Sequence, residues 1–277
     1  MDARKPSLGK PLFVYLLPGL VCLALSLLIG WSSYGDRINH IFYDLYFRQR
    51  GALPVADNIV IVGIDDATLA EYGPLPLDRS RLARGIEALR QAQVHVIVLD
   101  MLLTDPGDPE EDEALARALA TPAHSESLVL ATALDTSGQR WLKPLPSFAA
   151  AASAVGHVHW DPDGDGVSRR VLLEQHSGRE RYWALTVECF RAAIGTTSDP
   201  ITETDEELGL PGVHGPFQVP ARRRDGRSLL INYAGGNGTF PEISFASLGK
   251  DPSVPSRLKG KTVFLGVTAQ GTGDRLF

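Results

Sequence analysis

This sequence of 277 residues lacks both a disulfide framework and an excess of positive charge. It has two cysteines, Cys22 and Cys189, and Cys22 lies inside an apolar run. A disulfide bond between them is therefore not expected to stabilise a domain of this size. Its 27 Lys and Arg stand against 33 Asp and Glu, which gives a net charge of −6. Nucleic-acid-binding proteins need a basic face to displace phosphate counterions, so we expect no nucleic acid as a partner.

Catalytic motifs are lacking as well. The sequence contains no G-x-S-x-G elbow, no zinc-type group of Cys and His, and no internal repeat. Apolar residues make up 44% and charged residues 22% of the chain, ordinary values for a globular protein that exclude wholesale disorder. We therefore expect a folded protein that is not an enzyme, with no catalytic residues, no resident metal and no cofactor.

The sequence does contain one long uncharged apolar run over residues 12–31. A helix of this length reaches about 30 Å, the thickness of the hydrocarbon core of a bilayer. A cleaved signal peptide has a shorter apolar stretch followed by small residues, whereas this run ends in Ile29, Gly30 and Trp31. The run predicts one N-terminal transmembrane helix, with the lipid bilayer as a partner.

The charges on either side of the run predict its orientation. Arg4, Lys5 and Lys10 precede it, whereas Arg37 is the only Lys or Arg in the fifteen residues that follow, 32–46. Positively charged flanks tend to stay on the cytoplasmic side. We therefore expect residues 1–11 to be a cytoplasmic tail, with everything after residue 31 extracytoplasmic.

A juxtamembrane stalk helix is predicted within residues 32–53. Apolar side chains recur there at helical spacing and share one side of the helix, namely Ile38, Ile41, Phe42, Leu45 and Tyr46. Such a stalk could carry a movement from the domain to the membrane, or it could simply seat the domain there. We expect a homodimer that forms through the stalk and the membrane helix.

Strands and helices alternate in the first part of the remaining chain. Strands that are apolar on both faces and alternate with helices are typical of parallel βαβ units. We expect Asp78 to cap the first helix. The fold class predicted for residues 54–277 is α/β, with a mixed, largely parallel central sheet flanked by helices. The expected strands are residues 58–64, 94–99 and 128–133, and the expected helices are residues 79–91 and 110–120.

The second half is predicted to be less regular. Two strand patterns flank a turn at residues 161–167 and predict a hairpin. The acidic stretch 201–207 and the basic stretch 222–224 are expected to be solvated loops. The other expected elements are strands at residues 155–160, 168–174, 227–233 and 261–267, and a helix at residues 182–194.

Four aspartates, Asp65, Asp66, Asp100 and Asp105, are predicted to follow the carboxyl ends of adjacent parallel strands. Ligands of open α/β sheets bind at this edge, so these side chains are candidates for holding a divalent cation, or an anion through one. Aspartate is also common in strand-to-helix loops as a turn and cap residue. Both interpretations stay open.

A second acidic motif, residues 161–166, matches the opening of a calcium-binding loop. The match ends at Arg169 and Leu172, so we favour a turn held by side-chain-to-backbone hydrogen bonds over a metal site. His157 and His159 would share one face of a strand, but no third ligand is near in sequence. We expect them to be core or surface histidines.

A series of short motifs covers nearly all of the chain after the apolar run. In chain order they are Asp36-x6-Tyr43-Asp-x2-Phe47-Arg48, Ile59-Val-Ile-Val-Gly-Ile-Asp65-Asp66, Leu75-Pro76-x2-Arg79, Val96-Ile-Val-Leu-Asp100, Asp112-x2-Leu115, Gly156-His-Val158, Asp163-Gly-Asp-Gly-Val-x-Arg169-Arg170, Ile231-Asn-Tyr233, Gly260-Lys-x-Val-Phe-Leu-Gly266 and Gly273-Asp274. This ordered set resembles the second CHASE family (CHASE domain type two). That family comprises extracellular sensory domains of bacterial cyclases, histidine kinases and Ser/Thr kinases.

The resemblance implies a signalling role at a bacterial inner membrane. The stalk residues that match are Asp36, Tyr43, Asp44, Phe47 and Arg48. Arg79 joins the four aspartates as a candidate for binding an unknown small-molecule or environmental signal.

Two departures from the family accompany the resemblance. The family usually places aromatic residues around the Pro-x-x-Arg motif, where this chain has Leu75 and Leu77. Its members typically continue into further membrane helices and a kinase or cyclase, whereas this chain stops at Phe277. We expect either the sensory part of a longer polypeptide or a protein without its own output domain.

The function predicted from the sequence is that of a membrane-anchored sensory domain. It would relay a conformational change through the stalk and the membrane helix to a kinase or cyclase that this chain does not contain. One alternative is a membrane-tethered, metal-dependent hydrolase that uses the four aspartates. The other is a non-catalytic ectodomain that binds another protein.

Overall fold

A computed structural model describes residues 13–120, 126–212 and 215–270. The predicted cytoplasmic tail, residues 1–11, lies outside the described residues, as does the Gly273-Asp274 motif. Contacts within the chain divide it into two compact units, Met1–Leu53 and Pro54–Phe277.

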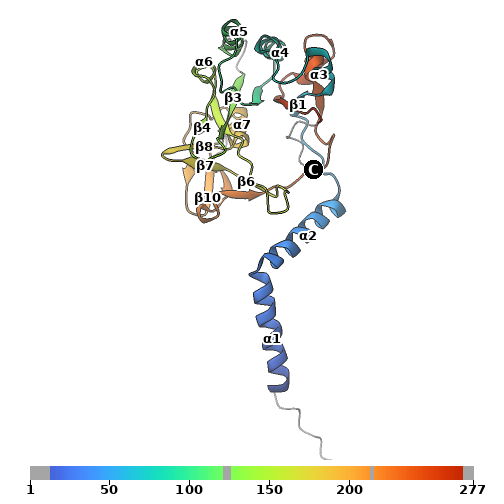
Figure 1. Ribbon diagram of the computed structural model, residues 1–277, viewed down its shortest axis with the longest axis vertical. Helices are drawn as coiled ribbons and strands as arrows, with labels where there is room; N and C mark the ends of the chain where they lie inside the picture. Colours follow the sequence, from blue (N-terminus) through green and yellow to red (C-terminus); the bar gives the residue numbers. More distant parts are fainter. Residues whose placement is uncertain (1–12, 121–125, 213–214, 271–277) are drawn as a thin grey trace, which may run out of the picture. The chain divides into compact units, whose positions relative to one another are not determined.

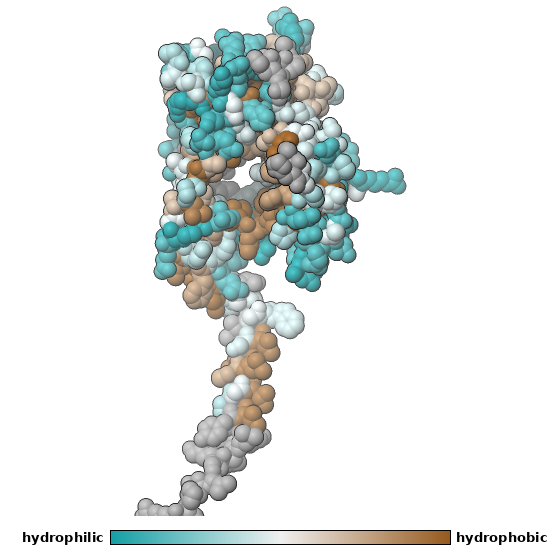
Figure 2. Space-filling view, turned by 180° about the vertical axis from the view of Figure 1, so that it is seen from behind, coloured by the Kyte–Doolittle hydropathy of each residue, from teal (hydrophilic) through white to brown (hydrophobic). Residues whose placement is uncertain are grey.

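The first unit consists of two helices, α1 (Phe13–Gly30) and α2 (Ser33–Arg50), which Figure 1 shows in blue. Figure 2 shows hydrophobic side chains along the described part of α1, where leucines such as Leu16 and Leu28 are exposed. A search of the described residues finds no helix that is both long and apolar enough to cross a membrane.

Helix α2 lies within the predicted stalk segment, residues 32–53, and its C-cap is Gly51. The φ of Gly51 is +73°, a backbone conformation that favours glycine, and its N–H donates to the Phe47 carbonyl. The rings of Tyr43 and Phe47 lie 4.7 Å apart on one side of the helix. Six apolar side chains project from the rest of its surface and are exposed, namely Tyr34, Ile38, Ile41, Phe42, Leu45 and Tyr46.

The second unit is built on a seven-stranded sheet in the order β13-β1-β14-β2-β3-β4, with β5 also paired to β3. All of its neighbouring strands are parallel except β4, which is antiparallel to β3. The predicted mixed, largely parallel sheet is therefore confirmed. The strands are β1 (Ile59–Ile64), β2 (Val96–Asp100), β3 (Ser127–Leu134), β4 (Trp141–Leu142), β5 (Ala154–His157), β13 (Glu242–Ser244) and β14 (Thr262–Val267).

Strand β14, the last strand within the described residues, occupies the middle of this sheet. Strand β14 pairs with β1 on one side and with β2 on the other, so Leu265 stands between Val62 and Leu99. All three side chains are fully buried. Strands β1 and β2 are consecutive in the sequence but are not neighbours in the sheet. They are connected through β14, which comes from the far end of the domain.

Helices cover both faces of the sheet. Helices α4, α5, α6 and α8 contribute Ile86, Leu115, Phe148 and Leu258 to the larger core, against β1, β2, β3 and β14. Helix α7 covers the other face, where Cys189 packs in a second cluster with valines of β2 and β3. The helices are α3 (Asp66–Tyr72), α4 (Arg79–Gln91), α5 (Pro109–Ala120), α6 (Pro146–Ala149), α7 (Leu185–Ala193) and α8 (Val254–Leu258).

Helix α4 begins and ends where its apolar stripe predicts, but the expected cap differs. Asp78 holds the N-cap position without a capping side-chain hydrogen bond. Its carboxylate instead accepts a hydrogen bond from Arg81 Nε at 3.1 Å. The Asp78 carboxylate is therefore engaged by a side chain one turn into the helix rather than by the backbone.

The predicted hairpin around residues 161–167 is wrong. Strand β5 joins the main sheet beside β3, whereas β6 (Arg170–Leu172) pairs with β12 (Ser228–Leu230). The helix expected from residue 182 starts at Leu185, because β8 (Glu180–Trp183) pairs with β7 (Glu174–Ser177). A strand pattern shows that a segment is extended, but long-range packing chooses its partner.

A small three-stranded sheet replaces the loops expected near residues 201–207. It comprises β9 (Thr202–Glu203), β10 (Glu207–Leu210) and β11 (Phe217–Pro220), and the 3-10 helix η1 (Arg223–Asp225) follows it. Leu208 is fully buried in a third cluster with Val187 of α7. The prediction of a solvated loop is wrong for residues 201–207, because part of this segment forms β9 and the start of β10. The basic residues 222–224 are exposed, as predicted. A second 3-10 helix, η2 (Phe245–Ser247), was not expected either.

His157 ends β5 and is buried, with 2% of its surface exposed. Its Nδ1 accepts a hydrogen bond from the His159 backbone N–H at 3.2 Å, and within the described ranges its Nε2 has no partner. Burial, helped by the charge of His159, lowers the pKa of His157 from 6.5 to about 4. The side chain is therefore a neutral core histidine, which agrees with one of the two roles expected from sequence.

We expect the free energy of unfolding to fall as the pH drops from about 6.5 to about 4. As the pH falls, His157 is protonated at a higher pH in the unfolded chain than in the folded chain. Protonation therefore favours the unfolded state and lowers the free energy of unfolding by about 3 kcal/mol once the pH is below the folded pKa. His157→Asn keeps an acceptor for the His159 N–H but cannot be protonated. Urea unfolding of the full chain in detergent, between pH 7 and 4, should show a shallower pH dependence for this variant.

The matched control is His176→Asn, because the His176 side chain is 56% exposed. It should leave the pH dependence unchanged. A slope for His157→Asn equal to that of the unsubstituted chain would show that His157 does not contribute.

Candidate functional site

The carboxyl edge of the sheet holds the first two predicted site residues in hydrogen bonds. Asp65 follows β1 and caps α3, accepting from the Thr68 N–H at 2.9 Å and the Thr68 hydroxyl at 2.7 Å. It also accepts from the Ser244 hydroxyl at 2.8 Å, which joins β1 to β13. Burial acts to raise the pKa of Asp65, but these hydrogen bonds outweigh it and hold the pKa below its ordinary value.

Asp66 and Asp100 lie on either side of the end of β14. Asp66 Oδ1 accepts from the Gln270 backbone N–H at 2.9 Å, which ties the β1–α3 turn to the segment after β14. Asp100 ends β2, is exposed, and stands opposite Gly266 of β14. A Cβ on Gly266 would approach the Asp100 carbonyl oxygen to 3.3 Å, so glycine allows the two strands to end side by side.

Arg79 organises the loop between β2 and α5. Its Nη1 forms an ion pair with Asp112, and its Nη2 donates to the backbone carbonyl of Asp105. The guanidinium also lies 5.4 Å from the centre of the Phe148 ring. The hydrogen bond from Arg79 lowers the pKa of Asp112. The structure thus brings Arg79 to the main chain of Asp105, while the Asp105 carboxylate is exposed and accepts from the Thr104 hydroxyl.

The four aspartates do not assemble a cation cage. Across the described ranges, no three of them bring one carboxylate oxygen each within 4.8 Å of the others. Asp65, Asp66 and the Asp105 main chain instead accept hydrogen bonds from Ser244, Gln270 and Arg79, which belong to other segments of the chain. This edge is chemically suited to accept hydrogen bonds, and a cation would have to displace existing donors.

The acidic turn at residues 161–166 is neutralised from within the chain. Arg169 is buried, and its Nη1 lies 2.9 Å from Asp163 Oδ2 and 3.0 Å from Asp165 Oδ1. Its Nη2 lies 2.8 Å from Asp165 Oδ2, and these hydrogen bonds lower the pKa of Asp165 to about 2. A guanidinium therefore supplies the positive charge that calcium would bring to these two carboxylates.

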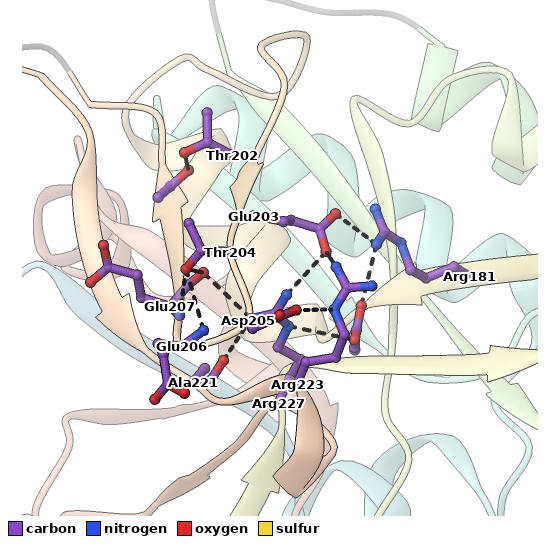
Figure 3. Close-up of polar contacts among 12 residues, drawn as sticks. Arg181, Thr202, Glu203, Thr204, Asp205, Glu206, Glu207, Ala221, Arg223 and Arg227 are labelled. Carbon is purple, nitrogen blue, oxygen red and sulfur yellow. Dashed lines mark hydrogen bonds and ion pairs between the residues drawn. The ribbon is translucent and has the colours of Figure 1, made fainter.

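Sequence reasoning missed an ion network centred on Arg227 and Glu203 (Figure 3). Arg227 is fully buried, and its Nη1 donates to the Ala221 carbonyl at 2.7 Å. Its Nη2 lies 3.4 Å from Glu203 Oε2, and Arg181 Nη1 lies 2.7 Å from Glu203 Oε1. The opposite charges of the segments 201–207 and 222–224 were the signal available in the sequence.

The predicted stalk residues all lie in α2. Tyr43, Asp44 and Phe47 are half-buried, and Arg48 is exposed. Asp36 belongs to the first turn of the helix. Tyr43 and Phe47 lie one helical turn apart, as their spacing in the sequence predicts.

We expect Asp65→Ala to lower the free energy of unfolding by about 1–2 kcal/mol, because α3 loses its cap. Asp65→Asn should lose less, since its amide oxygen can still accept from Thr68. Urea unfolding followed by tryptophan fluorescence measures both variants. Asp105→Ala is the control, because that carboxylate is exposed, and equal losses at the two positions would contradict the capping role.

Comparison with known proteins identifies the family. The sequence matches the CHASE2 domain over residues 20–277, which includes both α2 and the whole described sheet. Neither a search of curated proteins nor a search of solved structures found a match. CHASE2 domains are extracellular sensory domains of signalling receptors, and this chain belongs to the CHASE2 domain family.

Proposed function

We propose that this chain is the extracytoplasmic sensory unit of a receptor in a bacterial inner membrane, with no catalytic role of its own. The observation that carries the proposal is the family match, which runs without interruption from residue 20 to residue 277. The stalk and the globular unit are therefore parts of one family pattern. The uncharged run at residues 12–31, with the positive charges before it, supports anchoring with the N-terminus in the cytoplasm.

Strand β1 supports a route by which the signal reaches the stalk. Helix α2 ends at Arg50, and the chain enters β1 only a short segment later, at Ile59. At the other end of β1, Asp65 bonds Ser244 of β13 and Asp66 bonds Gln270 after β14. A signal that alters these contacts would shift β1 against its neighbours and so displace the stalk.

The proposed signal-binding residues are Asp65, Asp66, Arg79, Asp100 and Asp105. A ligand drives the change only if it binds one arrangement of the domain better than the other. Binding at this edge therefore has to compete with, or reinforce, the hydrogen bonds described above. We propose that the stalk residues Asp36, Tyr43, Asp44, Phe47 and Arg48 relay the shift to a kinase or cyclase output.

Thiol labelling in intact cells tests the orientation. In a Cys22→Ser background, Asp205→Cys should react with a membrane-impermeant thiol reagent, because the Asp205 side chain is 90% exposed. Cys189 should contribute little background, since it is buried and burial raises the pKa of its thiol to about 11. Ser7→Cys is the control and should react only after permeabilisation. Protection of Asp205→Cys in intact cells would overturn the orientation.

The exposed side of α2 supports a parallel homodimer. Tyr34, Ile38, Ile41 and Leu45 of α2 alternate at spacings of four and three residues and are all exposed. This is the a/d spacing of a two-stranded coiled coil. We propose that two copies of the chain pair along this seam.

Disulfide cross-linking in membranes tests the seam in the Cys22→Ser background. Ile41→Cys should form a dimer on mild oxidation, because a seam position faces its counterpart in the second copy. Asn39→Cys, an exposed position off the seam, should not. Equal cross-linking at positions 39 and 41 would rule out this register.

A further inference from the structure

A cavity of about 330 Å³ opens beside the Arg227 network in the second half of the globular unit. Its lining includes Glu174 and His176 of β7, Arg181 of β8, and Arg223 of η1. Cavities of this size hold small molecules. It lies apart from the carboxyl edge of the main sheet, since its lining comes from the small sheets.

Positive charge exceeds negative charge next to this cavity. Arg181, Arg223 and Arg227 converge on two carboxylates, Glu174 and Glu203. A third carboxylate, Asp205, lies 3.7 Å from Arg223, but its side chain is 90% exposed, and such a surface pair contributes little. Figure 3 shows the three guanidiniums gathered around Glu203. Among the residues that line the cavity, two are arginines, Arg181 and Arg223, and one is a carboxylate, Glu174.

Guanidinium donors remain available there. Arg181 lies over the Trp183 ring at 4.4 Å and uses only its Nη1 for Glu174 and Glu203, so its Nε and Nη2 have no acceptor in the part of the chain that the structure describes. Arg227 is fully buried and does not line the cavity, so Arg181 and Arg223 are the guanidiniums that a ligand there could contact. Stacking holds Arg181 in one orientation, so little ordering is needed when an acceptor arrives.

We propose that this cavity binds a small molecule that carries an oxyanion, a carboxylate or a phosphate. The planar donors of Arg181, together with the guanidinium of Arg223 in the same lining, suit the two or three oxygens of such a group. The cavity wall from Leu172 and Gly226 supplies the apolar surface for the remainder of the molecule. The inference concerns binding alone and does not depend on the signalling role proposed above.

Isothermal titration calorimetry on the full chain in detergent tests the site. Inorganic phosphate and succinate are titrated separately, at an ionic strength kept constant with chloride. We expect saturable binding of at least one. Binding of phosphate alone would indicate a phosphorylated ligand, and binding of succinate alone would indicate a carboxylic acid. Binding of both would indicate a site for oxyanions in general.

Two variants locate the binding. Arg181→Lys keeps the charge that Glu174 and Glu203 need but loses the planar pair of donors, and Arg223→Gln removes a charge from a side chain that is 60% exposed. Each should weaken binding about tenfold, the loss expected for one hydrogen bond to a charged group. Unfolding temperatures are measured alongside, and Arg223→Gln decides the result if Arg181→Lys does not fold.

Arg224→Gln is the matched control. Arg224 adjoins Arg223 but is 70% exposed, pairs with Asp225 at 3.8 Å, and does not line the cavity. It should bind as the unsubstituted chain does. The proposal is overturned if neither anion gives saturable heat, or if Arg224→Gln weakens binding as much as Arg223→Gln.

Discussion

The position of β14 is the constraint on which the rest of the globular unit depends. Strands β1 and β2 do not touch as a pair, because β14 lies between them and supplies hydrogen bonds to both. The sheet is therefore complete only when β14, near the C-terminal end of the domain, has paired with β1 and β2 near its beginning. Such pairing between distant segments is slow to form. Once β14 is in place, it sets where α4, α5 and α8 pack and brings Asp66, Asp100 and Gln270 to one edge.

The second half of the unit depends on a different interaction, the burial of Arg227. Removing a guanidinium from water is costly, and the cost is offset here by the Ala221 carbonyl and by Glu203 and Glu174. Through those partners the network joins β7, β9 and β12. The small sheets share only a modest apolar core around Leu208, so this network and the core together determine how they meet.

These two constraints bear on function in different ways. Under the proposed signalling role, the hydrogen bonds of Asp65 and Asp66 are the contacts through which an event at the sheet edge would reach β1. The region around Arg227 is held together by charge pairs, and Arg181 keeps donors beside the cavity that have no acceptor in the described residues. Under the two proposals, the sheet edge transmits a shift and the cavity holds a ligand.

By itself the sequence determined the parallel core, the long helices and the family. Strands such as β1 and helices such as α4 carry their own periodicity, since burial on one or both faces leaves a local pattern. It also placed the candidate aspartates at strand ends. Tertiary structure alone decided that β14 fills the centre, that β5 and β6 are not a hairpin, and that Glu203 holds three arginines. Pairings between distant segments leave no periodic trace, because the partner is chosen by packing and charge compensation in three dimensions.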